Sequence, residues 1–238
     1  YRKKLTVFFS DIKGFTEITD RLEPEVLSTL LNSYLNEMSK IALKYGGTID
    51  KFVGDAILIF FGDPETKGDK EDAYSCVLMA LEMQERMHHL KNLWEGQGIT
   101  NPLEIRIGIN TGYCNVGNFG SENRLDYTII GGEVNLASRL ESNAMTGQIL
   151  ISQETYALIK KHIVCEKKDE IKVKGIAHKI QTYQVVGLYK NIAQKRKILN
   201  EEFDGFNLNI DLNISKKNKV ITSLENTLKQ LKKNEKSN

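Results

Sequence analysis

The stretch TIDKFVGDAILIF, residues 48–60, decides the fold because it holds two strands with almost nothing between them. Its β-branched and aromatic residues predict strands over Thr48–Val53 and Ala56–Phe60. Only Gly54 and Asp55 separate the two strands, which is the length of a tight antiparallel hairpin. The sequence therefore predicts a sheet that holds an aspartate at the tip of one of its hairpins.

Strands and helices interleave on both sides of this hairpin. A buried strand over Leu5–Ser10 ends at Asp11 and a glycine-containing turn, and helices are predicted over Pro24–Tyr45 and Asp69–Leu93. The remaining pattern predicts strands over residues 104–111, 114–119, 126–130, 148–151, 170–173 and 182–188, and helices over 134–144 and 152–160. This order predicts an α/β sandwich in which a mixed or antiparallel sheet lies under helices.

The composition fits a soluble globular protein of one domain with an appendage. The 238 residues are 40% hydrophobic and 27% charged, and 33 basic residues nearly balance 31 acidic ones, so we expect no nucleic-acid partner. Three cysteines without a CxxC pair favour neither disulfides nor a zinc site. We expect a main domain over residues 1–189 and a Lys-rich appendage over residues 190–238, with one strand at 206–212 and one helix at 219–232.

Two aspartates are candidate ligands for a divalent cation. Asp11 ends a buried strand and Asp55 sits at the hairpin tip, so the sheet would hold both side chains rigidly. Two such carboxylates can share one or two Mg²⁺ ions, which prefer hard oxygen ligands and leave positions for phosphates. Either aspartate alone is more typical of an ordinary turn residue.

Three further residues are candidates for contacts to a substrate. Lys51 precedes Asp55 by four residues and shares a strand face with Val53, and its alternative is a solvent-facing lysine. Asn135 and Arg139 lie four residues apart and therefore project from one helix face, where they would suit a ribose and developing phosphoryl charge. A plain surface pair on a helix is the alternative for these two.

Taken together and in order, these segments resemble one family. The blocks FFSDIKGFT, DKFVGDAILIFFG, IRIGINTG, DYTIIGGEVNLASRLE and IKVKG followed by TYQVVG are similar to the successive blocks of class III adenylyl and guanylyl cyclase catalytic domains. The resemblance runs from about Leu5 to Leu188. It implies an α+β fold, a ferredoxin-like α/β sandwich with a mostly antiparallel sheet flanked by helices, and the conversion of ATP to cyclic AMP and pyrophosphate.

The resemblance also implies roles for individual residues. Asp11 and Asp55 match the two metal-binding aspartates, with the carbonyl of Ile12 as a further ligand for two Mg²⁺ or Mn²⁺ ions per site. Asn135 and Arg139 match the pair that orients the ribose and stabilises the transition state. Residues that match contacts to the triphosphate are Gly14, Phe15, Thr16, Arg106 and Lys174.

Two positions carry the choice of base in this family. Lys51 matches the lysine that reads the adenine ring, and Thr128 matches the Asp or Thr that accepts from the adenine amino group; guanylyl cyclases usually have Glu and Cys there. A lysine can donate to a ring nitrogen of adenine, whereas guanine presents an N–H at that position. The resemblance thus implies an adenylyl cyclase, with a guanylyl cyclase or an inactive nucleotide-binding dimerisation domain as alternatives.

The family's active site lies between two catalytic domains, and this chain carries both sets of residues. The resemblance therefore implies a homodimer with two equivalent sites. The chain opens on a strand, from which we expect an N-terminal sensor or membrane region to be missing. We expect a cytoplasmic catalytic domain.

Overall fold

The computed structural model describes residues 1–99, 103–173, 179–191, 198–203, 205–211 and 217–235. The chain divides into two compact units, Tyr1–Val186 and Gly187–Asn238, which are described separately. Among the described residues, none of the helices combines the length and the apolar character that a membrane span requires.

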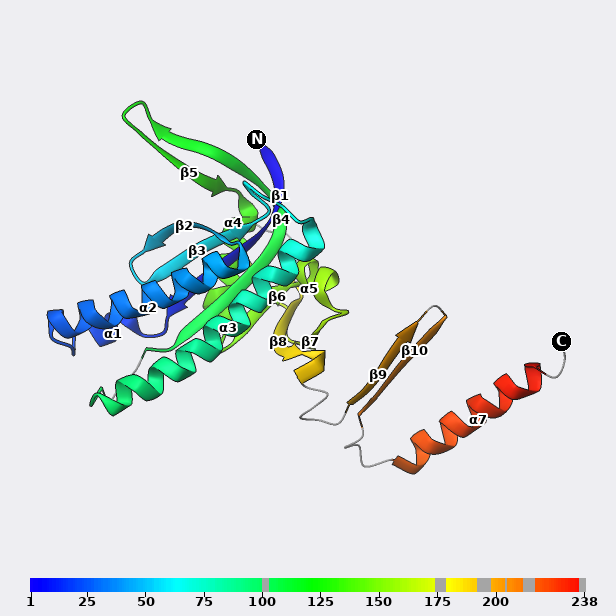
Figure 1. Cartoon of the computed structure of the whole chain (residues 1–238). Coiled ribbons are helices and arrows are strands. Elements are labelled where there is room, and N and C mark those ends of the chain that lie inside the picture. The colour runs from blue at the N-terminus through cyan, green and yellow to red at the C-terminus, as the bar shows by residue number, and fades with distance from the viewer. Residues whose placement is uncertain (100–102, 174–178, 192–197, 204, 212–216, 236–238) are drawn as a thin grey trace. The chain divides into compact units, whose positions relative to one another are not determined.

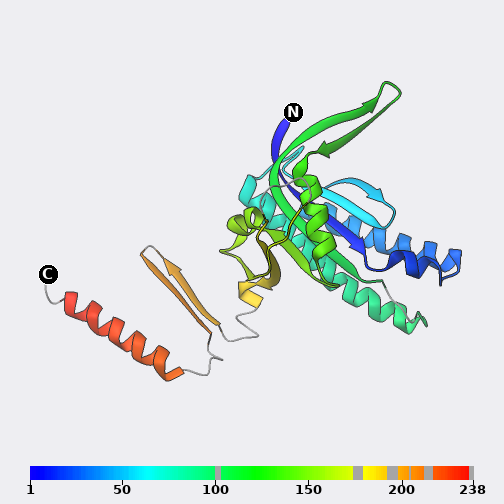
Figure 2. The same ribbon diagram turned by 180° about the vertical axis from the view of Figure 1, so that it is seen from behind.

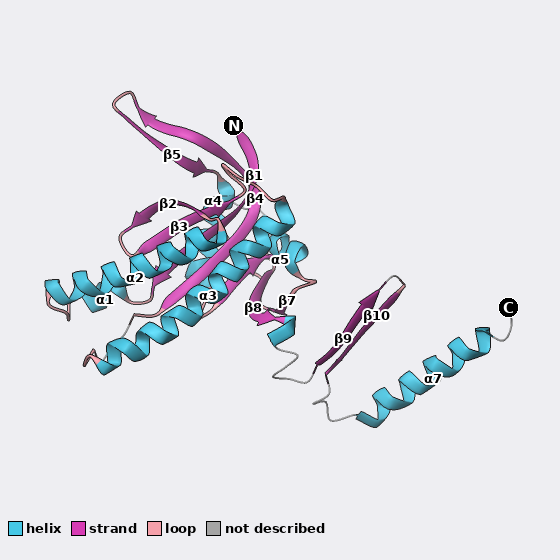
Figure 3. Cartoon of the chain, viewed as in Figure 1, coloured by secondary structure: helices cyan, strands magenta, loops and turns pink. Residues whose placement is uncertain are grey.

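The first unit is built on one eight-stranded sheet (Figures 1 and 3). The strand order is β2-β3-β1-β4-β6-β8-β7, with β5 paired to β4 outside this path. The β4–β6 pair is parallel, whereas β1–β3, β1–β4, β2–β3, β4–β5 and β6–β8 are antiparallel. The strands are β1 (Arg2–Ile12), β2 (Thr48–Val53), β3 (Ala56–Phe61), β4 (Ile105–Ser121), β5 (Arg124–Ile130), β6 (Ile149–Ser152), β7 (Ile163–Lys167) and β8 (Thr182–Leu188).

Helices cover both faces of this sheet. One face carries α2 (Pro24–Tyr45) and α3 (Asp69–Gly96), with α5 (Gln153–Ile159) against α3, and α4 (Gly132–Asn143) covers the other, as the view from behind shows (Figure 2). Strand β1 contacts both layers because its side chains alternate. Val7 packs near Ala137 of α4, whereas Ser10 lies 3.5 Å from the hydroxyl of Tyr34 in α2. The expectation of an α+β sandwich with a mostly antiparallel sheet is confirmed.

Local sequence signals explain where several elements begin and end. Helix α2 has the predicted bounds, because Pro24 suits its first turn and Gly46, at φ 80°, ends it. The β2–β3 hairpin turns at Gly54 and Asp55, where Gly54 has φ 64°. Helix α5 begins after Ser152, whose hydroxyl accepts a hydrogen bond from the Thr155 backbone N–H.

Some predicted elements differ from the structure. The two strands predicted over 104–111 and 114–119 are one strand, β4, and a short helix α1 (Phe15–Thr19) replaces part of the predicted turn. Residues 170–173 form no strand; only an isolated bridge joins Ile171 to Ile180. Val173 and Ile180 are buried in an apolar cluster with Leu136 and Leu140 of α4. The sequence analysis predicted no strand at the position of β7.

The second unit holds more strand than expected. It contains a two-stranded antiparallel hairpin, β9 (Ile198–Phe203) and β10 (Phe206–Asp211), and the helix α7 (Lys217–Glu235). Only the second of these strands was predicted. The prediction missed β9 because its segment, ILNEEF, lacks a run of β-branched residues.

Candidate functional site

Asp11 and Asp55 face each other at the end of β1. Asp55 lies in the β2–β3 turn, and its Oδ2 accepts a hydrogen bond from the Ile12 backbone N–H at 2.9 Å. Burial, and then the neighbouring carboxyl of Asp11, raise the pKa of Asp55 to about 7. Bringing two carboxylates together in this way is unfavourable unless a proton or a cation lies between them.

This pair fits a divalent cation that needs few protein ligands. Among the described residues no group of three or more His, Cys, Asp and Glu side chains is placed to hold a metal. A pair of carboxylates suits Mg²⁺, because Mg²⁺ keeps waters or phosphate oxygens in its remaining positions. The chemistry of the donor set thus agrees with the predicted metal ligands.

Arg106 joins this carboxylate pair to helix α4. It pairs with Asp11 in the β1–β4 register, and its Nη2 lies 3.4 Å from Oδ2 of Asp11 and 2.8 Å from Oε1 of Glu141. Its Nη1 also donates to the Ser142 carbonyl at 3.4 Å. The Nε atom is buried without a hydrogen-bond partner in the described part of the chain, so the guanidinium does not use all of its donors.

Lys51 and Thr128 come from different strands and meet at a third residue. The Thr128 hydroxyl donates to Oδ2 of Asp50 at 2.6 Å, and Nζ of Lys51 lies 3.3 Å from Oδ1 of the same carboxylate. The side chain of Asp50 is 1% exposed and Thr128 is 6% exposed, whereas the Lys51 side chain is 42% exposed. The structure therefore brings the two predicted base-reading residues together.

Asn135 and Arg139 project from the outer face of α4. Both are exposed, and within the described residues neither side chain forms a hydrogen bond or an ion pair. The opposite face of the helix buries Leu136, Ala137 and Leu140 against the sheet. Both side chains are therefore free to meet a ligand, and none of the described residues holds them at the carboxylate pair.

Gly108 allows α4 to lie directly against β4. A Cβ atom at this position would come within 2.2 Å of the Glu141 nitrogen and 2.3 Å of the Ala137 carbonyl oxygen. The helix backbone therefore approaches the strand closely, which sets the position of Arg139 and brings Glu141 to Arg106.

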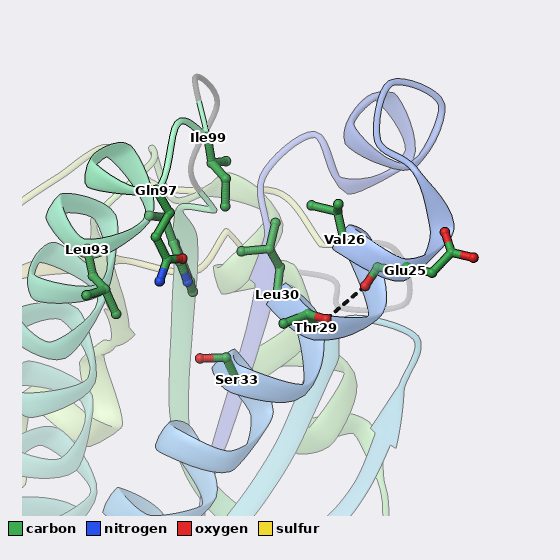
Figure 4. Close-up of a pocket in the computed structure, with 9 residues that line it drawn as sticks. Glu25, Val26, Thr29, Leu30, Ser33, Leu93, Gln97 and Ile99 are labelled. Atoms are coloured by element: carbon green, nitrogen blue, oxygen red, sulfur yellow. Dashed lines mark hydrogen bonds between the residues drawn. The ribbon is translucent and has the colours of Figure 1, made fainter.

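The remaining predicted residues lie near the carboxylates or outside the described residues. Gly14, at φ 68°, precedes α1, which begins at Phe15 and Thr16 directly after β1. Lys174 lies outside the described residues. A pocket of about 440 Å³ between α2 and α3 contains none of the predicted site residues (Figure 4). Its lining consists of Glu25, Val26, Thr29, Leu30, Ser33, Leu93, Trp94, Gln97 and Ile99.

The sequence analysis missed three residues that contact the candidate site. Asp50 and Glu141 hold predicted site residues, as described above. Tyr34 is fully buried on α2, and burial, with added repulsion from the nearby Asp55 and Asp11, raises the pKa of its hydroxyl. Asp50 stands next to Lys51 in a strand whose other residues are mostly apolar, and this is the one signal in the sequence.

Comparisons with known proteins show the family of the chain. Residues 2–187 match the family model described as adenylate and guanylate cyclase catalytic domain. The terminal-differentiation specific adenylate cyclase of Dictyostelium discoideum is 35% identical over 189 residues, which cover 77% of this chain and 9% of that protein. Adenylate cyclase 1 of Rhizobium meliloti is 31% identical over 194 residues, covering 81% of this chain and 29% of that protein.

A solved cyclase structure is also similar to this chain. The adenylyl cyclase CyaB from P. aeruginosa superposes with a TM-score of 0.77 and 65% identity, covering 78% of this chain and 95% of that one. This chain spans less than a third of the length of the two curated relatives. The residues that match the family model include the eight-stranded sheet, apart from the last residue of β8, and its helices. The chain belongs to the adenylate and guanylate cyclase catalytic domain family.

Proposed function

We propose that the chain is an adenylyl cyclase that converts ATP to 3′,5′-cyclic AMP and pyrophosphate. The observation that carries the proposal is that Lys51 and Thr128 meet at the carboxylate of Asp50. A lysine and a hydroxyl suit the ring nitrogens and the amino group of adenine. Residues 1–189 form the catalytic domain in this proposal, and residues 190–238 are an appendage.

The reaction is an in-line displacement at the α-phosphorus. The ribose 3′-oxygen forms a bond to the α-phosphorus and its proton passes to solvent water. The bond from the α-phosphorus to the bridging oxygen of the β-phosphate breaks, and pyrophosphate leaves. Divalent cations, Mg²⁺ or Mn²⁺ and two per site, supply Lewis-acid stabilisation of the attacking and leaving oxygens when bound. Asp11, Asp55 and the Ile12 carbonyl would hold them, and a bound cation would offset the burial and the neighbouring Asp11 carboxyl that raise the pKa of Asp55.

The other residues position the substrate and stabilise its charge. The guanidinium of Arg106 donates hydrogen bonds to the phosphates. Further contacts to the phosphates come from Lys174 and from the backbone of Gly14, Phe15 and Thr16. Asn135 orients the ribose, and Arg139 stabilises charge that develops on the α-phosphate. Both side chains are exposed and form no hydrogen bond or ion pair within the described residues, which leaves them able to contact a substrate.

We further propose that the site is completed by a second copy of the chain. Among the described residues, no hydrogen bond or ion pair links Lys51, Thr128, Asn135 or Arg139 to Asp11, Asp55 or Arg106. Large apolar side chains are exposed on the end of β2 and along β4–β5, an arm that extends from the sheet (Figure 1). These are Phe52, Val53, Tyr113, Leu125, Tyr127 and Ile130. Such a surface is typical of an interface, and one C2 dimer would contain two equivalent sites.

The test is an assay of the purified chain with ATP and with GTP, in Mg²⁺ and in Mn²⁺, over a range of protein concentrations. We expect cyclic AMP, a higher kcat/KM for ATP than for GTP, and a specific activity that rises with protein concentration. A preference for GTP would identify a guanylyl cyclase instead. No product from either nucleotide with either metal would leave an inactive nucleotide-binding domain.

A further inference from the structure

Asp50 occupies an irregular position in the edge strand β2. Ile49 pairs with Ile59 of β3 and Lys51 pairs with Leu58, so Asp50 is an extra residue without a partner on β3. This is a β-bulge, a feature that turns a side chain away from the direction regular alternation would give it. At this bulge the chain carries an aspartate whose side chain is almost fully buried.

The carboxylate of Asp50 binds groups from two strands. Its Oδ2 accepts from the Thr128 hydroxyl at 2.6 Å and from the Ile129 backbone N–H at 3.2 Å. Its Oδ1 lies 3.3 Å from Nζ of Lys51 and has no aligned hydrogen bond within the described residues. Asp50 therefore ties the two base-reading candidates to one another through a single buried side chain.

The direction of the Thr128 hydrogen bond has a chemical consequence. A carboxylate only accepts, so the hydroxyl hydrogen of Thr128 is used by Asp50, and the lone pairs of its oxygen remain for a third group. Adenine carries an amino group at the position where guanine carries the O6 acceptor. A hydroxyl held as an acceptor attracts the amino group and repels O6, whereas a freely rotating hydroxyl accepts either base.

We propose that Asp50 is a positioning residue for base selection, which fixes the Thr128 hydroxyl as a hydrogen-bond acceptor and so favours ATP over GTP. This inference rests on the proposed adenylyl cyclase function. Asp50 itself does not touch the base, since its side chain is 1% exposed and both of its oxygens face groups of the chain. Its effect passes through Thr128.

The test compares variants by the ratio of kcat/KM for ATP to kcat/KM for GTP. Asp50→Ala frees the Thr128 hydroxyl, and we expect the ratio to fall about tenfold, the equivalent of one hydrogen bond. Asp50→Asn keeps the ratio, because its carbonyl oxygen still accepts from Thr128 and Ile129. Asp126→Ala is the matched control: it removes an exposed carboxylate from β5, two residues from Thr128, and leaves the ratio unchanged.

A double-mutant cycle separates positioning from a merely structural role. In a Thr128→Val background the hydroxyl is absent, so Asp50→Ala changes the ratio no further. Asp50→Ser has a shorter side chain that ends before Thr128 and admits water, so we expect the same fall in the ATP-to-GTP ratio as for Asp50→Ala. This variant is used in place of Asp50→Ala if the alanine variant does not stay folded. Thermal unfolding of each variant reports whether it is folded in the assay.

The outcomes distinguish this inference from the function on which it rests. If the unmodified chain prefers ATP and Asp50→Ala lowers both turnovers without changing the ratio, Asp50 is only structural and the inference is wrong. The inference is also wrong if Asp50→Ala lowers the ATP-to-GTP ratio equally in the presence of Thr128 and in the Thr128→Val background. If the unmodified chain forms no cyclic nucleotide, or prefers GTP, the proposed function itself fails.

Discussion

Nη2 of Arg106 lies 2.8 Å from Oε1 of Glu141, and this ion pair is largely buried, because the two side chains are 16% and 5% exposed. Burial raises the pKa of the Glu141 carboxyl above its usual range, and the positive charge of Arg106 partly offsets the effect. The same guanidinium atom lies 3.4 Å from Asp11. Glu141 and the candidate metal ligand therefore compete for one arginine.

Glu141→Gln should shift this competition. Without the Glu141 charge, Arg106 binds Asp11 more strongly, so a cation must displace a stronger partner. We expect the Mg²⁺ concentration for half-maximal activity to rise several-fold and the free energy of unfolding to fall by about 1–3 kcal/mol, because the largely buried guanidinium loses the closer of its two carboxylate partners. Magnesium titrations of activity and urea unfolding measure the two effects.

Glu104→Gln is the control for that experiment. Glu104 forms an ion pair with Lys91 in which both side chains are at least a third exposed, so its loss should change neither quantity measurably. A Glu141→Gln variant with an unchanged magnesium requirement would show that Arg106 does not compete for Asp11.

Mixing two inactive variants tests the shared site. Asp55→Ala lacks a metal ligand and Arg139→Ala lacks the residue proposed to stabilise charge, so each homodimer has two defective sites. A mixed dimer has one site with both defects and one with none. We expect an equimolar mixture to recover about a quarter of the original activity, since half of randomly formed dimers are mixed and each has one intact site. If the mixture forms no more cyclic AMP than either variant alone, the shared site is wrong.

Elements with a strong local signal were predictable. Helix α2 combines a long apolar stripe with Pro24 at its start and glycine at its end, and the sequence indicated both of its bounds. The hairpin at Gly54 and Asp55 followed from strand composition and loop length. The aspartate pair was suggested by the positions of these strand ends, although only the β1–β3 pairing brings the two ends together.

Elements that depend on distant partners were not predictable. Strand β4 runs unbroken through Gly112, which local propensity marks as a break, because Gly112 pairs with Leu5 and leaves space for Glu133. The roles of Asp50 and Glu141 depend on contacts across 78 and 35 positions of the sequence, to Thr128 and Arg106. No local pattern contains such contacts.

Gly108→Ala should be strongly destabilising. The added Cβ would meet the backbone of α4 at 2.2 and 2.3 Å, and neither the strand nor the helix backbone can move aside without losing the packing of Ala137 and Leu140. We expect a loss of about 3 kcal/mol or more in the free energy of unfolding, measured in urea. Gly96→Ala is the control, because no atom lies within 4 Å of its Cβ position and the residue ends helix α3. It should be neutral or slightly stabilising.

Asp63 ties the start of β1 to the β5 arm, and its pKa makes this contact sensitive to acid. It accepts hydrogen bonds from the Tyr1 hydroxyl at 2.6 Å, from Nζ of Lys3 at 2.8 Å and from the Tyr127 hydroxyl. Burial alone would raise the pKa of this carboxyl, but the three hydrogen bonds outweigh burial and hold the pKa below its usual range.

Asp63→Asn should therefore destabilise the chain at neutral pH and much less in acid. A carboxyl whose pKa is lowered by folding stabilises the folded state above its unfolded pKa of about 3.9, and this contribution disappears as the pH falls through the folded pKa. We expect a loss of about 2 kcal/mol at pH 7 that shrinks below pH 3.9, measured by urea unfolding across pH. Asp20→Asn, at an exposed position after α1, should show no such dependence. An equal loss for Asp63→Asn at all pH values would mean that the contact depends on shape and not on the ionised carboxylate.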